Sequence, residues 1–263
     1  MNAAVSLLRP APTNAATRPQ LTDALRATVG AKSAATLALL REAVAEFGAH
    51  GELAFANSFG AEDMVLTDLI LSNGLPITIF SLDTGRLPAE TYSLIGEVER
   101  RYGTKLEIYF PDAGAVETYV RSHGINAFYD TVELRKACCG VRKMEPLARL
   151  LAGREAWISG LRREQSNTRA VVPFREVDGE GRIKVNPLAD WSWADVWHYI
   201  ETHDVPYNPL HDAFMPSIGC APCTRAIAVG EDFRAGRWWW EDEAQKECGL
   251  HVRKADERVA EPA

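Results

Sequence analysis

Hydrophobic and polar residues follow two different periods along most of the chain. Apolar residues recur at helical spacing in two sets, Leu21 to Val29 and Ala35 to Phe47, which predict two helices ahead of the first strand. Helical spacing also predicts one helix that begins near Glu62 and two more over 89–102 and 191–201. Short apolar runs bounded by turn residues predict strands at 53–56, 77–82, 106–110 and 156–159.

The order of these elements decides the fold class. Strands and helices alternate, which is typical of an α/β protein with a mostly parallel sheet flanked by helices. The runs 171–177 and 182–185 flank a polar Asp-Gly-Glu-Gly stretch and predict a β-hairpin. One α/β domain is therefore expected over residues 21–235.

The two ends of the chain lack this periodicity. Residues 1–20 mix Ala, Pro, Thr and Asn and are interpreted as a flexible extension. Residues 236–263 contain three consecutive tryptophans, Trp238 to Trp240, and then a polar string, so we predict a mobile C-terminal tail outside the core. The tryptophans either anchor the tail by packing or form a partner surface, and we favour packing.

Composition narrows the class of protein. The 263 residues are 46% hydrophobic and 25% charged, which fits an ordinary globular domain. Lys and Arg number 29 against 36 Asp and Glu, a net charge of −7 that argues against non-specific binding of nucleic acid. The chain shows neither an apolar run of the roughly 18 residues that cross a bilayer nor a signal-peptide pattern. We therefore expect a cytoplasmic protein.

Four of the five cysteines form a candidate metal site. Cys220 and Cys223 make a C-x-x-C pair, and Cys138 and Cys139 are neighbours in the sequence. Four thiolates suit zinc or an iron–sulfur cluster. Adjacent side chains diverge on regular backbone, so a cluster with several irons fits better than one zinc ion. The alternatives are a thioredoxin-like redox pair and buried apolar cysteines.

The fifth cysteine, Cys248, lies in the polar tail. Lys246 and His251 flank it and favour its thiolate electrostatically, which makes it a candidate nucleophile. The alternative is an incidental surface cysteine.

Two turns are candidate anion sites. Ser58-Phe59-Gly60-Ala61-Glu62-Asp63 joins a predicted strand to a helix and offers backbone N–H groups, although it lacks the Walker A sequence. Leu82-Asp83-Thr84-Gly85 follows the next strand, at the same edge of the sheet. A plain turn, with Asp83 as a helix cap or turn former, is the alternative.

Basic residues gather in an otherwise acidic chain. Arginine forks bind phosphate and sulfate in bidentate fashion, so these clusters favour an oxyanion site, while solvated surface groups are the alternative. The clusters contain Arg135, Lys136, Arg142, Lys143, Arg162, Arg163, Arg169, Arg225, Arg234 and Arg237.

Taken together, the motifs SFGAED, LDTG, CCGVRK, ISGLRREQS, NPLADWSWADVW, PYNPLHD, GCAPCTR, AGRWWWE and KECGLH resemble the assimilatory adenylyl-sulfate (APS) reductases. The resemblance covers about Phe47 to His251. It implies an adenine-nucleotide α-hydrolase-like fold and a role in assimilatory sulfate reduction. Asn57 departs from the family pattern, where Ser or Thr is common.

The resemblance also implies roles for individual residues. Cys138, Cys139, Cys220 and Cys223 match the ligands of a [4Fe-4S] cluster, and Cys248 matches the nucleophile. The substrate-binding residues it implies are Ser58, Phe59, Gly60, Asp63, Leu82, Asp83, Gly85, Lys143, Gly160, Arg162, Arg169, Arg234, Arg237 and His251.

The chemistry implied by the resemblance has two steps. The Cys248 thiolate attacks the sulfur of APS and releases AMP, which leaves an S-sulfocysteine, and reduced thioredoxin or glutaredoxin then releases sulfite. The family often forms homo-oligomers. The alternatives are a phosphoadenylyl-sulfate (PAPS) reductase, dual specificity for APS and PAPS, and a non-catalytic iron–sulfur or zinc redox sensor.

Overall fold

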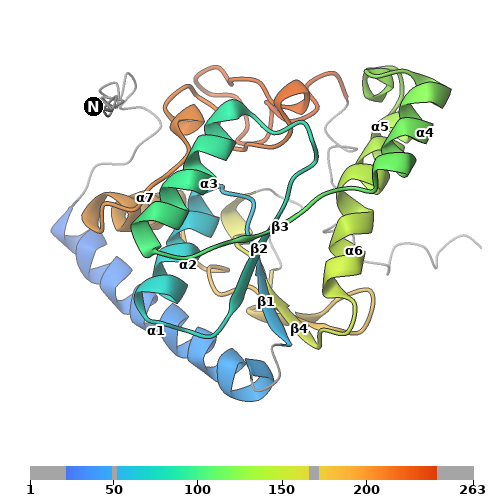
Figure 1. The fold of residues 1–263 in the computed structure, drawn as a ribbon. Coiled ribbons are helices and arrows are strands. Elements are labelled where there is room, and N and C mark those ends of the chain that lie inside the picture. Colours follow the sequence, from blue (N-terminus) through green and yellow to red (C-terminus); the bar gives the residue numbers. More distant parts are fainter. Residues whose placement is uncertain (1–21, 49–51, 166–171, 242–263) are drawn as a thin grey trace, which may run out of the picture.

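The computed structural model describes residues 22–48, 52–165 and 172–241, and they form a six-stranded sheet with helices on both faces (Figure 1). The strand order is β3-β2-β1-β4-β6-β5. All pairs are parallel except β5 with β6. The strands are β1 (Leu53–Ala56), β2 (Thr78–Leu82), β3 (Glu107–Tyr109), β4 (Ala156–Ile158), β5 (Arg175–Val177) and β6 (Ile183–Val185). The predicted fold class and the hairpin are confirmed.

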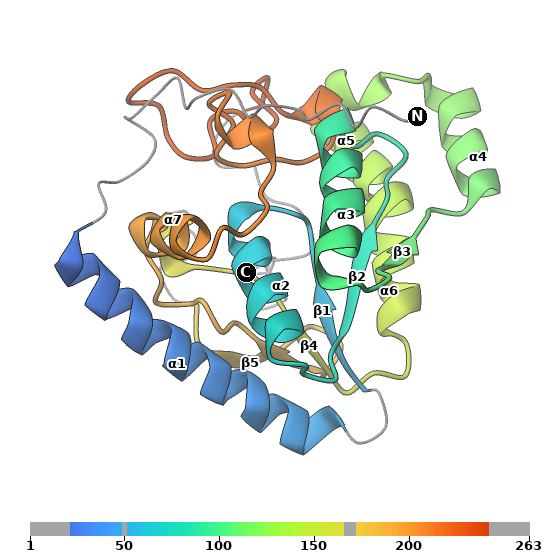
Figure 2. The ribbon, with the colours of Figure 1, turned by 60° about the vertical axis from the view of Figure 1, so that its left-hand side comes forward.

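Two apolar clusters hold the helices to the sheet. Figure 2 shows how the helices lie around the sheet. The larger one packs α1 (Asp23–Phe47), α2 (Ala61–Ser72), α3 (Ala89–Tyr102) and α7 (Trp193–Thr202) against one face. The smaller one packs α6 (Glu145–Leu151) against the other face through Leu147, Leu150 and Leu151. Strands β1, β2 and β4, which contribute to both clusters, thus bury side chains on both faces, as is typical of a parallel sheet.

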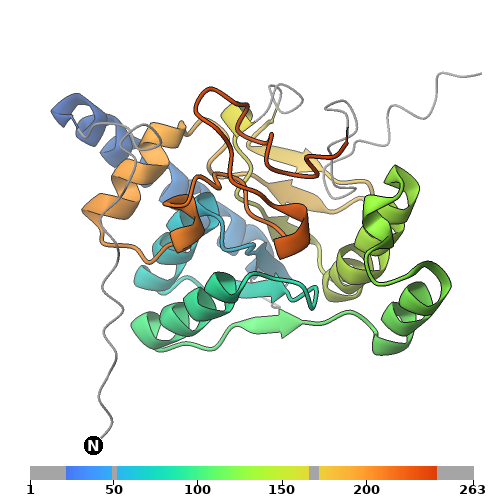
Figure 3. The same cartoon turned by 90° about the horizontal axis from the view of Figure 1, so that it is seen from above.

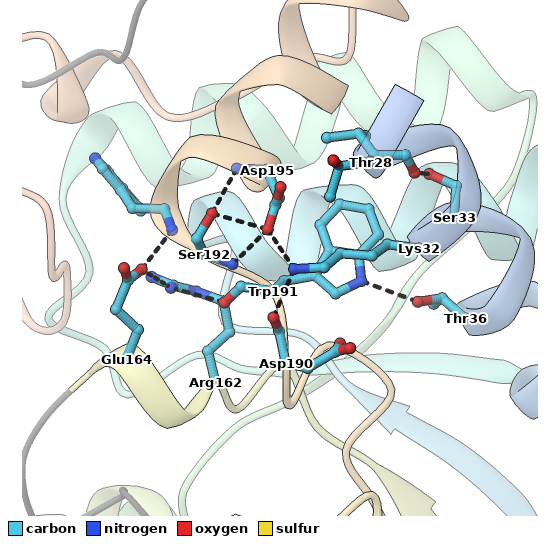
Figure 4. Close-up of polar contacts among 12 residues, drawn as sticks. Thr28, Lys32, Ser33, Thr36, Arg162, Glu164, Asp190, Trp191, Ser192 and Asp195 are labelled. Atoms are coloured by element: carbon cyan, nitrogen blue, oxygen red, sulfur yellow. Dashed lines mark hydrogen bonds and ion pairs between the residues drawn. The ribbon is translucent and has the colours of Figure 1, made fainter. Parts of the chain in front are cut away.

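One helix, α1, replaces the two predicted before β1. Thr22 caps it by accepting a hydrogen bond from the amide of Leu25 (3.2 Å), and it continues through Gly30 to Phe47. Lys32 explains the continuity, because it donates to the carbonyl of Asp190 and forms an ion pair with Asp195 (both 2.7 Å). Figure 4 shows these contacts, which fasten the middle of α1 to the start of α7.

Helix α7 begins two residues later than predicted, because Ser192 caps it. The Ser192 side chain accepts from the amide of Asp195 (3.1 Å), and the Asp195 carboxylate accepts from the amide of Ser192 (2.7 Å). This reciprocal capping box fixes the first turn of α7 beside Lys32.

The hydrophobic pattern predicted no element in 111–155. The structure contains three helices there, α4 (Ala113–His123), α5 (Val132–Cys139) and α6, and a π-helical turn, η3 (Gly140–Met144), joins α5 to α6. Tyr119 is the one buried residue of α4, and Arg135 is the one buried residue of α5. Each of these two helices therefore buries a single side chain, so its sequence carries little of the pattern by which a core helix is predicted.

The segment after α7 crosses the edge of the sheet at which β1 and β2 end (Figure 3). It includes the short helical turns η6 (Pro209–His211) and η7 (Ala221–Cys223). The predicted tail boundary at 236 is too early, because Trp238 is 2% exposed and Arg237 forms a β-bridge with Thr224. Packing thus continues to Glu241, as predicted for the tryptophans, although Trp239 is 38% exposed.

The predicted extension 1–20 and the part of the tail from 242 to 263 lie outside the described residues. Within the described ranges, none of the helices is both long enough and apolar enough to span a bilayer.

Candidate functional site

The carboxyl ends of β1, β2 and β4 open onto a cavity of about 250 Å³. Its walls come from the turns after these strands, from α5 and η3, and from the segment 216–238. Ligands of open α/β sheets bind in this position, outside the carboxyl ends of the strands.

The turn after β1 is held in shape by Asn57. Its side-chain oxygen accepts from the amide of Phe59 (2.7 Å), and its amide nitrogen donates to the Thr67 hydroxyl on α2 (2.9 Å). Phe59 adopts a left-handed backbone conformation (φ 60°), which is unusual for a residue with a side chain. The Phe59 ring is buried in the core and does not line the cavity. The departure at Asn57 thus has a clear structural role.

Asp63 closes the same turn from the first turn of α2. Its Oδ2 accepts from both the backbone amide and the hydroxyl of Ser58, each at 2.6 Å. Burial raises the pKa of Asp63 to about 7, and the charge of Glu62 adds to this, while the Ser58 hydrogen bonds and the charge of Lys143 act in the opposite direction. The Asp63 carboxyl therefore changes charge near neutral pH inside the cavity.

Arg162 lies behind the cavity wall, paired with Glu62. The two side chains are 1% and 8% exposed, and Nη2 of Arg162 lies 2.8 Å from Oε1 of Glu62. Arg162 also pairs with Glu164 (2.8 Å) and donates to the carbonyl of Trp191 (3.2 Å), as Figure 4 shows. Burial raises the pKa of Glu62, but the Arg162 charge and several hydrogen bonds hold it below its usual value. Glu62 lines the cavity and Arg162 does not.

The turn after β2 combines structural and cavity-facing residues. Asp83 accepts from the amide of Gly85 (2.7 Å) and from the Tyr92 hydroxyl (2.9 Å), and Gly85 takes a φ of 72°. Asp83 and Gly85 therefore form the turn, in agreement with the alternative for Asp83, and neither lines the cavity. Leu82 and Thr84 line it, and the Thr84 hydroxyl lies 3.1 Å from Sγ of Cys220.

All four predicted metal-site cysteines line the cavity, and none is in a disulfide. Helix α5 ends at Cys139 and η3 follows directly, so the adjacent pair lies where regular helix gives way to π-helix. Such a helix irregularity is frequent at functional sites. On the segment after α7, Cys220 caps the short helical turn η7 and Cys223 is its last residue.

The donor set fits a cluster better than a single ion. Among the described residues, no group of three or more His, Cys, Asp or Glu side chains converges closely enough to hold one metal ion. The thiols are nevertheless close enough for the charge of one to shift the pKa of another. Burial first, and then the neighbouring Cys220, raise the pKa of Cys223 to about 12, and burial also raises that of Cys138. Four half-buried thiols around one cavity suit a group that is larger than one ion and compensates their charge as thiolates.

Basic side chains surround the cysteines. Arg142 donates to the carbonyl of Thr84 (2.7 Å), which links the turn after β2 to the helix turn η3. Arg237 donates to the carbonyls of Ile218 (3.2 Å) and Cys223 (3.3 Å). Lys143, Arg234, Arg86 and Arg135 line the same cavity, which therefore has six cationic residues and is a suitable environment for an anionic group.

The structure thus brings together most of the substrate residues implied by the resemblance. Phe59, Asp83, Gly85 and Arg162 lie outside the cavity lining, while Arg169, Cys248 and His251 lie outside the described residues. Those that line the cavity are Ser58, Gly60, Asp63, Leu82, Lys143, Gly160, Arg234 and Arg237.

Sequence reasoning gave no role to several polar residues of the cavity wall, among them Glu62, Arg86 and Gln165. Glu62 and Gln165 lie within the quoted motifs SFGAED and ISGLRREQS, so the motifs contained the signal. Arg86 directly follows the LDTG turn, and its carbonyl accepts from the amide of Ala221 beside the cysteine pair (2.8 Å).

A family model and similar proteins of known name agree on one family. Residues 52–226 match the phosphoadenosine phosphosulfate reductase domain. The chain is 58% identical to the adenosine 5'-phosphosulfate reductase of Allochromatium vinosum over 228 residues, which cover 86% of this chain and 88% of that protein. It is 59% identical to the protein of that name from Burkholderia cepacia over 204 residues (77% and 82% covered).

Solved structures agree on the fold. A phosphoadenylyl-sulfate reductase from Candida auris, in complex with phosphate, superposes with a TM-score of 0.62 at 27% identity, over 80% of this chain and all of that one. Yeast FAD synthetase superposes with a TM-score of 0.55 at 18% identity, over 82% of this chain and 73% of that one, which is a likeness of fold alone.

Proposed function

The chain belongs to the phosphoadenosine phosphosulfate reductase family, and we propose that it reduces adenosine 5'-phosphosulfate (APS) to sulfite and AMP in sulfate assimilation, with Cys248 as nucleophile. The relatives above 50% identity that bear the name adenosine 5'-phosphosulfate reductase support this substrate. The observation that carries the proposal is that the turn after β1, four cysteines and six basic residues meet in one cavity.

The first step forms a covalent intermediate on the tail. The Cys248 thiolate attacks the sulfur of the sulfate group, a new S–S bond forms, and the S–O bond to the phosphate breaks with its electron pair going to AMP. Thiolate and substrate are both anionic, so they repel each other. Lys143, Arg234 and Arg237 offset that repulsion and the charge that grows on the departing phosphate.

The second step returns Cys248 to its thiolate form. A dithiol protein of the thioredoxin type attacks Sγ of Cys248 with one thiolate, and sulfite leaves with the electron pair of the broken S–S bond. The partner's second thiol then resolves the mixed disulfide. The partner is oxidised by two electrons, and Cys248 is again free to attack APS.

Residues of the cavity have separate roles in binding. The start of α2 presents backbone N–H donors to an anionic group of the nucleotide, and Asp63, which accepts from both donors of Ser58, fixes the turn that leads into this helix. Cys138, Cys139, Cys220 and Cys223 would hold a [4Fe-4S] cluster. Such a cluster, when bound, supplies a compact iron–sulfide group whose positive irons compensate the thiolates and tie the two cysteine segments together.

Sulfite release from APS and from PAPS, measured side by side with reduced thioredoxin, tests this function. We expect turnover with APS, and we expect the Cys248→Ser variant to bind APS without releasing sulfite. A clear preference for PAPS would overturn the substrate assignment. Unchanged turnover of Cys248→Ser would overturn the nucleophile, and binding without any turnover by the unmodified protein would favour a sensor.

A further inference from the structure

The segment just ahead of Cys248 is fastened to helix α5 by a buried ion pair. Nε of Arg135 lies 2.9 Å from Oε1 of Glu241, and Nη2 lies 2.7 Å from Oε2. The side chains are 1% and 2% exposed. Both carboxylate oxygens are used, so the contact fixes the orientation of Glu241 as well as its distance from α5.

Trp238 fastens the same segment to the second cysteine turn. Its ring lies 4.6 Å from the Arg135 guanidinium and 4.8 Å from that of Arg237. Its amide donates to the carbonyl of Cys223 (3.3 Å). Residues 236–241, which we call the tail root, therefore contact both α5, with Cys138 and Cys139, and the turn with Cys220 and Cys223.

The position of this anchor limits where Cys248 can go. Arg135 and Trp238 both line the cavity, so the tail root lies in the cavity wall. Cys248 is the seventh residue after Glu241, and seven residues span at most about 25 Å when fully extended. Because Glu241 is fixed in the cavity wall, the Cys248 thiol stays within that distance of it. The effective concentration of the thiol at the cavity is therefore high.

Stability alone is a poor explanation for the pair. A buried ion pair often contributes no more to stability than apolar residues of the same volume would, because both charges lose their hydration. The pair does hold Glu241, the last described residue before Cys248, in one position and orientation.

We propose that Arg135 and Glu241 are positioning residues, which hold the tail root in the cavity wall so that the Cys248 thiolate reaches the bound nucleotide. The inference rests on the proposed function, since it takes Cys248 as the nucleophile. Neither residue is required to touch the substrate. Losing the pair should therefore slow the reaction of Cys248 while leaving APS affinity nearly unchanged.

The experiment separates binding from reaction in the full-length protein. Equilibrium APS binding is measured in a Cys248→Ser background, with and without Glu241→Gln. Transfer of the SO₃ group to Cys248 is followed in a single turnover without reductant, by the mass of the peptide that carries Cys248. Glu231→Gln is the matched control, because Arg225 and Glu231 also form a two-point pair, but one that is about one-third exposed.

We expect Glu241→Gln to slow transfer at least tenfold, with APS affinity within about twofold of the parent. Arg135→Lys keeps the charge but loses the fork, so it should have a smaller effect of the same kind. Amide hydrogen exchange over 234–241 should be faster in Glu241→Gln, which reports the loosened tail root independently of catalysis. Glu231→Gln should change none of these measurements.

Three results would count against the inference. If Glu241→Gln transfers the SO₃ group at the parent rate although its tail root exchanges faster, the positioning role is overturned and the proposed function stands. Equal losses of affinity and transfer rate overturn it in favour of a merely structural pair. Absence of any SO₃ transfer to Cys248 in the unmodified protein overturns the proposed function, and the inference with it. If Glu241→Gln fails to fold, Arg135→Lys decides by the same criteria.

Discussion

Gly160, the second residue after β4, lies against the carboxylate of Asp63 on α2. A Cβ atom at position 160 would overlap Oδ1 of Asp63 and would lie 3.3 Å from both Cγ of Asp63 and Cβ of Glu62. The space for a side chain at this position is therefore already filled by the group that holds Ser58. Two walls of the cavity meet there without room for a methyl group.

The first prediction follows from that contact. Gly160→Ala should push Asp63 away and break its hydrogen bonds to Ser58, so that APS affinity falls by about tenfold or more, the effect of losing one or two hydrogen bonds to a charged group. Isothermal calorimetry in the Cys248→Ser background measures it. Gly30→Ala is the control, because nothing lies within 4 Å of a Cβ there and α1 tolerates alanine. Unchanged affinity in Gly160→Ala would contradict the role given to Asp63.

A second prediction concerns pH. Burial raises the pKa of Asp63 to about 7, and an anionic ligand in the same cavity disfavours the carboxylate further. Binding of APS is then coupled to retention of a proton, so affinity should fall as pH rises above about 7, by at most about tenfold per pH unit.

The matched variants identify the titrating group. Asp63→Asn should remove the fall in affinity above pH 7. Asp68→Asn should keep it, because the Asp68 carboxylate accepts from Tyr102 and Tyr199 and does not line the cavity. If the pH dependence survives in Asp63→Asn, another group titrates.

The third prediction concerns stability. Arg162→Met leaves the buried Glu62 carboxylate without its main partner, and breaking a buried pair in this way costs about 3–5 kcal/mol of unfolding free energy. Urea unfolding at pH 7 measures the change. Arg175→Met removes an exposed pair with Glu46 and should cost no more than about 1 kcal/mol. Similar losses in the two variants would show that the burial of Glu62 does not govern the cost.

Sequence patterns predict elements well where a short segment decides its own structure. The strand 53–56 and the helix 89–102 lie where predicted, because turn residues bound them and their apolar spacing is clear. The extent of α1 depends instead on Lys32, whose partners Asp190 and Asp195 are about 160 residues away in the sequence. A pattern within 20 residues contains no trace of such contacts.

The residues of the candidate site also divide into those that local motifs predict and those whose roles depend on distant partners. The motifs predict a site of four cysteines and an anion-binding turn after β1 as separate features, and the structure brings them to one cavity. They do not reveal that Arg162 is used internally by Glu62 and Glu164, or that Arg135 is buried against Glu241. A basic residue in a motif can bind a ligand or neutralise a buried carboxylate, and only the tertiary partner distinguishes these uses.

The last prediction concerns the four cysteines that line the cavity. If they hold a [4Fe-4S] cluster, protein purified without oxygen should contain about four irons and four sulfides per chain and absorb broadly in the visible range. Cys223→Ser should lose most of this iron, because a serine hydroxyl does not replace the thiolate that the cluster requires. Cys248→Ser should keep it, because that residue belongs to the tail and not to the ligand set. One zinc per chain without sulfide would instead show that the thiols rearrange around a single ion, and retention of all iron in Cys223→Ser would remove Cys223 from the ligands.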